Sequence, residues 1–84
     1  MSDALKLVSD LEAVVVKKMP QVMPILQPPQ MAAALAIFSA AKKKDVATVE
    51  ASAKKLMATM TSDQSKKLEP ILGKDLLKRL EAYK

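Results

Sequence analysis

Residues 31–41 read Met-Ala-Ala-Ala-Leu-Ala-Ile-Phe-Ser-Ala-Ala, and only one of these eleven residues is polar. Six of them are Ala, which has the highest intrinsic helix propensity of the amino acids. A helix that is apolar on every side is normally buried on every side. The stretch therefore predicts a buried, Ala-rich central helix over about 30–43, with the rest of the chain packed around it. Pro29 suits the first position of this helix.

The residues before the central helix predict a first amphipathic helix that runs from about residue 3 to Met19. Ser2 or Asp3 is expected to cap this helix, since both are favoured N-cap residues. Pro20 is expected to stop or kink it. Residues 20–29 contain four prolines and four apolar residues. We therefore expect an ordered connection there, with one short helical turn pinned to the core.

The residues after the central helix predict two or three further helices. Asp45 is expected to cap a helix whose apolar residues recur at spacings of three and four up to Met60. Thr61 opens a second capping segment, and the next helix is expected over about 63–69. Gly73 separates it from a last helix that begins near Lys74. The fold class is therefore all-α, a compact bundle of four or five short helices in one domain over 1–84.

The predicted core is aliphatic, because the chain holds only two aromatic residues, Phe38 and Tyr83. Helical periodicity selects the core residues on each predicted helix. The expected core comprises Leu5, Val8, Leu11, Val15, Leu35, Ile37, Phe38, Val49, Leu56, Leu68, Leu77 and Leu80.

The composition argues against catalysis. The chain has no Cys and no His, so thiol nucleophiles, imidazole bases and the common zinc ligands are excluded. Two stretches, 39–42 and 52–55, match the Ser-x-x-Lys pattern of serine–lysine nucleophiles, but the partner motifs of that chemistry are missing. We therefore expect a protein that is not an enzyme and that uses no metal and no cofactor.

The charge is basic, with a formal net charge of +5 that comes from thirteen Lys and one Arg against nine acids. Most of the basic pairs follow an acid by three or four residues, a spacing that favours pairing within one helix. Lys42, Lys43 and Lys44 have no acid in the preceding turn, so they are the best candidates for binding an anion. An alternative function is accordingly a weak, sequence-independent nucleic-acid-binding protein that uses the lysine pairs.

The leading functional hypothesis is a non-enzymatic protein–protein interaction module, an adaptor or small structural subunit that acts through an apolar helical surface. Apolar residues cover more than half of the first helix, and methionines, which suit adaptable binding surfaces, are frequent. The surface would bind another protein or a second copy of the chain, most simply as a homodimer. The expected partner-binding residues are Val14, Val15, Met19, Met23, Met57 and Met60.

The compartment is predicted from two missing signals. The first residues lack the basic region and apolar core of a signal peptide. The uncharged run 19–41 is long enough to span a bilayer, but prolines and glutamines interrupt its first half. A cytoplasmic location without a transmembrane segment is therefore expected.

Overall fold

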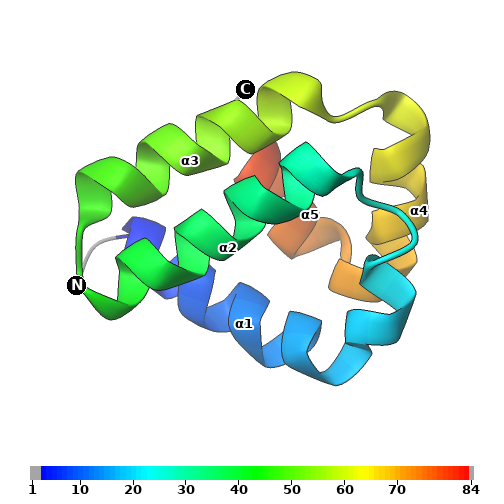
Figure 1. Ribbon diagram of the computed structural model, residues 1–84. Coiled ribbons are helices and arrows are strands. Elements are labelled where there is room, and N and C mark those ends of the chain that lie inside the picture. Colours follow the sequence, from blue (N-terminus) through cyan, green and yellow to red (C-terminus); the bar gives the residue numbers. More distant parts are fainter. Residues whose placement is uncertain (1–2, 84) are drawn as a thin grey trace.

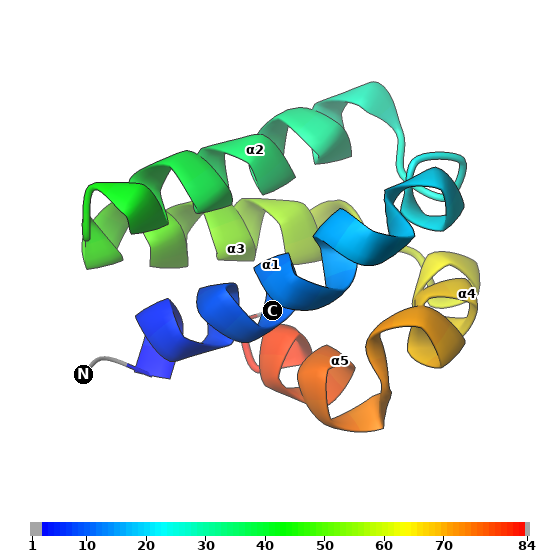
Figure 2. The same ribbon diagram turned by 90° about the horizontal axis from the view of Figure 1, so that it is seen from below.

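The computed structural model describes residues 3–83, and these form five α-helices. The all-α bundle expected from the sequence is confirmed. In Figures 1 and 2, α2 and α3 lie side by side as an antiparallel hairpin, α1 and α5 lie on the other side of the core, and α4 closes one end. The helices are α1 (Asp3–Val22), α2 (Pro28–Lys42), α3 (Val46–Thr59), α4 (Ser62–Leu72) and α5 (Lys74–Glu81).

The first helix, α1, is the element around which the described residues pack. It contacts each of the other four helices, whereas the backbone of α2 approaches only that of α1 and α3. Its buried residues include Ala4, Val8 and Leu11, whose spacing of four and three places them on one face. The sequence predicted that the helix at about 30–43 occupies the centre of the bundle. In the structure, α1 occupies that position.

A kink divides α1 near its end. Lys18 has φ of −116° and ψ of 22°, values that are not helical. Pro20 explains the kink, because proline has no N–H to donate and its ring clashes with the carbonyl four residues earlier. The helix then continues to Val22, which is buried in the core. The expected stop or kink at Pro20 is thus a kink. Ser2, one of the two expected caps, lies outside the described residues.

The connection between α1 and α2 is ordered, as the sequence predicted. The N–H of Ile25 donates to the carbonyl oxygen of Val22 at 3.0 Å, which closes a turn directly after α1. Ile25 and Leu26 pack partly buried against the core, whereas Met23 is 54% exposed. Pro28 and the proline after it then occupy the first two positions of α2, where a missing N–H costs no hydrogen bond.

One side of α2 is exposed, which differs from the expected burial of the whole helix. Ala33, Ile37 and Ala40 are buried, but Leu35, which we expected in the core, is 60% exposed. The reason is that α2 packs on α3 along one side and approaches α1 along another, so the remaining side has no partner within the described residues. Of the other expected core residues, Leu5, Val15 and Phe38 are half-buried and the rest are buried.

The substitution Ala33→Leu should destabilise the fold by about 1–3 kcal/mol, because the buried side of α2 has no room for a larger side chain. Thermal or urea unfolding followed by circular dichroism measures this. The matched control is Ala32→Leu at the neighbouring, exposed position of the same helix. That control should change stability by no more than about 0.5 kcal/mol. Equal effects of the two substitutions would contradict the one-sided burial of α2.

The predicted caps after α2 are confirmed. Asp45 caps α3, since its Oδ1 accepts a hydrogen bond from the N–H of Thr48 at 3.2 Å. Thr61 caps α4, and its Oγ1 accepts from the N–H of Gln64 at 3.2 Å. The helix α4 extends through Pro70 to Leu72, beyond the expected end near residue 69, and burial of Leu72 favours the additional turn.

The cap at Asp45 should make stability depend on pH. Hydrogen bonds from the Thr48 hydroxyl, at 2.6 Å, and from its N–H stabilise the carboxylate and lower the pKa of Asp45. A lowered pKa in the folded state adds stability above the unfolded pKa, and this stability is lost as the pH falls through the folded pKa. Asp45→Asn keeps a capping oxygen but does not titrate.

The melting temperature of the unsubstituted protein should therefore exceed that of Asp45→Asn at about pH 6, and the difference should shrink at about pH 2. Thermal melts at both pH values check this, and the other carboxyl groups cancel because both proteins contain them. A difference that does not change with pH would show that the Asp45 charge has no role.

Two buried glutamines join the N-termini of α2 and α4. The Nε2 of Gln30 donates to the Oε1 of Gln64 at 2.9 Å, and the Nε2 of Gln64 donates to the Oε1 of Gln30 at 2.7 Å. Each Oε1 also accepts the backbone N–H three residues earlier, from Gln27 at 2.8 Å and from Thr61 at 2.9 Å. The pair thus satisfies helix-end donors while it fixes two helices against each other.

One ion pair links α5 to α1. The Nη1 of Arg79 lies 2.9 Å from an Oδ of Asp10 and 4.0 Å from an Oδ of Asp75. The sequence predicted the second of these contacts, within α5, but the shorter one joins residues that are 69 apart in the chain. Both side chains of the shorter pair are about a third or more exposed, so the pair adds little stability and chiefly sets the orientation of α5.

Candidate apolar binding groove

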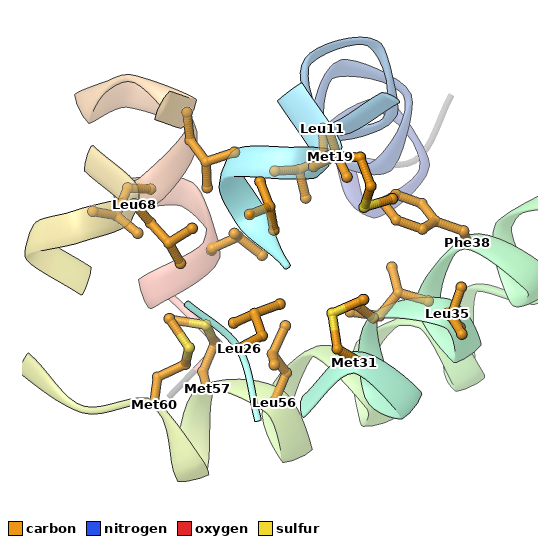
Figure 3. A pocket seen from close by; sticks show the side chains of 17 residues that line it. Leu11, Met19, Leu26, Met31, Leu35, Phe38, Leu56, Met57, Met60 and Leu68 are labelled. Atoms are coloured by element: carbon orange, nitrogen blue, oxygen red, sulfur yellow. The ribbon is translucent and has the colours of Figure 1, made fainter. Parts of the chain in front are cut away.

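An apolar pocket lies in the middle of the bundle. All five helices and the connection after α1 contribute to it, and every lining side chain is apolar. Figure 3 shows these side chains arranged around a central space. The lining residues are Leu11, Val15, Met19, Val22, Leu26, Met31, Ala34, Leu35, Ile37, Phe38, Leu56, Met57, Met60, Leu68, Leu72, Leu77 and Leu80.

The pocket has a buried floor and a partly exposed mouth. The floor consists of core residues such as Leu11, Ile37 and Met57. The mouth is formed by half-buried residues of α1 and α2, among them Met19 and Phe38, and by the exposed Leu35. Met19 and Val22, which follow the kink of α1, also line the pocket.

The unfilled space inside the pocket is small, about 70 Å³. For comparison, an engineered apolar cavity of about 150 Å³ in a well-studied protein core binds benzene. The pocket is lined by no polar side chain, so a ligand group with hydrogen-bonding atoms would lose its water without gaining a partner. The arrangement suits the tip of an aliphatic side chain.

Four methionines line the pocket: Met19, Met31, Met57 and Met60. Met57 lies at the floor and is only 2% exposed, while the other three are half-buried. A thioether side chain is flexible and adapts to the shape of what it contacts. The lining can therefore adjust to an aliphatic group that enters from the mouth.

The structure brings together four of the six residues that the sequence predicted for partner binding. Val15, Met19, Met57 and Met60 all line the pocket. The other two are placed elsewhere: Val14 is half-buried against the core on α1, and Met23 is exposed after the kink.

Sequence reasoning missed the part of the mouth that α2 supplies. Met31, Leu35 and Phe38 recur at spacings of four and three, so they share one side of the helix. Periodicity could have identified this stripe. The stripe does not stand out in the sequence, because the alanines around it make the helix apolar on every side.

The candidate anion-binding lysines lie at the C-terminal end of α2. Lys42, Lys43 and Lys44 are all exposed, and Lys44 adopts a left-handed φ of 57°. The N–H groups of Lys43 and Lys44 donate to the carbonyl oxygens of Ala40 and Ala41, at 3.1 and 3.0 Å, as the helix closes. This position also has a structural explanation, since cations stabilise the end of a helix.

A second, shallower cleft lies between the start of α1 and the end of α5. Asp3, Lys6, Asp75, Arg79 and Tyr83 are among its lining residues. Burial raises the pKa of the Tyr83 phenol, and the nearby carboxylates of Glu50 and Asp3 raise it further. The phenol is therefore protonated at neutral pH. Across residues 3–83, no three acidic side chains lie close enough together to hold a metal ion.

No family model, no curated protein and no solved structure matches this chain. Within residues 3–83, none of the helices has both the length and the apolar character needed to cross a membrane. By its fold and its pocket, the protein is an all-helical bundle with an apolar groove at its centre.

Proposed function

We propose that the protein is a non-enzymatic protein–protein interaction module that holds an apolar helical segment in the groove between α1 and α2. The observation that carries this proposal is the pocket, whose lining is entirely apolar and partly open to solvent. Protein interfaces place a few large apolar anchors in desolvated pockets at their centre, surrounded by residues of smaller effect. Exposed Leu35 at the mouth adds apolar surface to the groove.

The simplest partner is a second copy of the chain. A twofold interface uses the same surface on both protomers, so one apolar groove is enough to build a homodimer. The half-buried valines Val14 and Val15 extend the apolar surface along α1. We further propose a cytoplasmic location.

Capture from extracts of the source cell tests the interaction. Leu35→Glu places a charge at the mouth, whereas the control Val16→Glu places the same charge at an exposed residue that does not line the pocket. The unsubstituted protein and the control should retain the same partner, and Leu35→Glu should lose it. Equal capture by all three proteins would overturn the role of the groove.

The salt dependence of capture separates this function from nucleic-acid binding. Apolar association should change little between about 0.1 M and 0.5 M salt, whereas contacts to phosphate weaken steeply over that range. Substitution of Lys42, Lys43 and Lys44 by Gln should leave capture unchanged. Loss of binding in this triple variant, together with recovery of nucleic acid in place of protein, would favour the alternative function.

A further inference from the structure

We propose that two copies of the chain form a twofold dimer in which Leu35 of each protomer inserts into the apolar pocket of the other. This inference rests on the proposed interaction function and specifies the partner and the residue that enters the pocket. It follows from three observations: the size of the unfilled space, the position of Leu35 beside that space, and the absence of charge along α2.

The size of the space matches one aliphatic side chain. About 70 Å³ is unfilled, and all of it is bordered by apolar side chains. That volume is less than half of a cavity known to bind benzene, so it suits a smaller group such as the branched end of a leucine. Leu35 is 60% exposed, which leaves its side chain available to a neighbouring molecule.

The position of Leu35 makes the exchange symmetric. Leu35 stands at the edge of the pocket, on the same helix as Met31 and Phe38, which border the mouth (Figure 3). When a protruding side chain lies beside a hole in the same surface, a nearby twofold axis brings each side chain over the hole of the other copy. Both insertions then form at once, and each protomer covers the exposed leucine of its partner.

The helix that carries Leu35 also permits two copies to approach. From Pro28 to Ala41 there is no charged residue, so α2 can meet its own copy without repulsion between like charges. Ala32 and Ser39, three and four residues from Leu35, are exposed and small. In an antiparallel pair of α2 helices centred between residues 35 and 36, Ala32 faces Ser39 of the second copy, and neither obstructs the insertion.

Sedimentation equilibrium of the full chain tests the dimer. The unsubstituted protein should show a reversible monomer–dimer equilibrium as its concentration rises. Leu35→Ala removes the inserted group at an exposed position and should weaken dimerisation at least tenfold, the effect of a central anchor. Val16→Ala, at a residue that is 68% exposed and absent from the pocket lining, should leave the equilibrium unchanged. A single-chain mass at every concentration would overturn the inference.

A second variant tests the pocket without removing the leucine. Ala34 is half-buried and lines the pocket, so Ala34→Leu should fill the unfilled space from within. This variant should remain folded by circular dichroism and should also lose the dimer. In a dimer with one isotope-labelled protomer, Leu35 methyl groups should show intermolecular NOEs to methionine methyl groups of the other protomer. A dimer that survives both substitutions uses a different surface and contradicts the proposal.

Failure of the dimer is distinguishable from failure of the proposed function. The protein could stay monomeric and still capture a partner that Leu35→Glu loses and Val16→Glu retains. That result would support the interaction function and would contradict only the proposal that a second copy occupies the pocket. A protein that stays monomeric and captures nothing through the groove overturns both.

Discussion

Replacement of Leu11 by Ala should destabilise the protein by about 2–5 kcal/mol, the loss typical of truncating a buried leucine. Leu11 is 5% exposed and lies on the buried face of α1, the helix that contacts all four others. Its removal forfeits the burial of the side chain and enlarges the pocket, whose floor it forms. A small domain is stable by only about 5–15 kcal/mol, so this loss removes a large share of the stability and should clearly lower the urea midpoint.

Urea unfolding followed by far-UV circular dichroism measures this loss. The matched control is Leu35→Ala, which removes the same atoms from an exposed position of α2. At low protein concentration, where the monomer prevails, that control should cost less than about 1 kcal/mol. If the two substitutions cost the same, the central position of α1 is wrong.

The second large effect is expected at the buried glutamine pair. Gln64→Ala should cost about 2–4 kcal/mol, because it leaves buried groups without partners and removes part of a helix cap. The N–H of Thr61 and the carbonyl oxygen of Ile25, which accepts from Gln64 at 2.9 Å, lose their side-chain partner. The Gln30 amide loses its two bonds to Gln64 and keeps those to Gln27 and Thr59. Thermal unfolding measures the loss. Gln21→Ala, at an exposed glutamine, is the control and should be nearly neutral.

The pair should also behave as one unit. When both Gln30 and Gln64 are replaced by Met, a residue of similar size, the combined loss should fall short of the sum of the two single losses by about 1 kcal/mol or more. The reason is that each single replacement already breaks both hydrogen bonds between the two amides. Additive losses would show that the two side chains act independently.

Part of the groove was predictable from the sequence, because helical periodicity identifies residues that share a face. Val15, Met19, Met57 and Met60 were expected to bind a partner, and they line the pocket. Leu35 was predicted to lie in the core, but it is exposed. The alanines around it leave the helix without a polar face, so the sequence does not indicate which side meets solvent. Only contacts with other helices settle that choice.

The glutamine pair was hidden for a related reason. Thr61 followed three residues later by Gln is a sequence sign of a capping box, which could have placed Gln64 at the start of α4. Nothing local indicates that its amide meets that of Gln30, 34 residues earlier in the chain. The two side chains are buried because the N-termini of two helices converge, and this depends on the path of the connection after the kink.

The sequence by itself determined the class of fold, limited the number of helices to four or five, and located most of their ends, because propensity, capping and proline act within a few residues of the chain. Tertiary structure alone decided which helix occupies the centre, which side of α2 is exposed, and that a pocket remains between α1 and α2. These features depend on which apolar faces of the five helices pack against one another. That choice is made by packing between residues that are distant in the sequence.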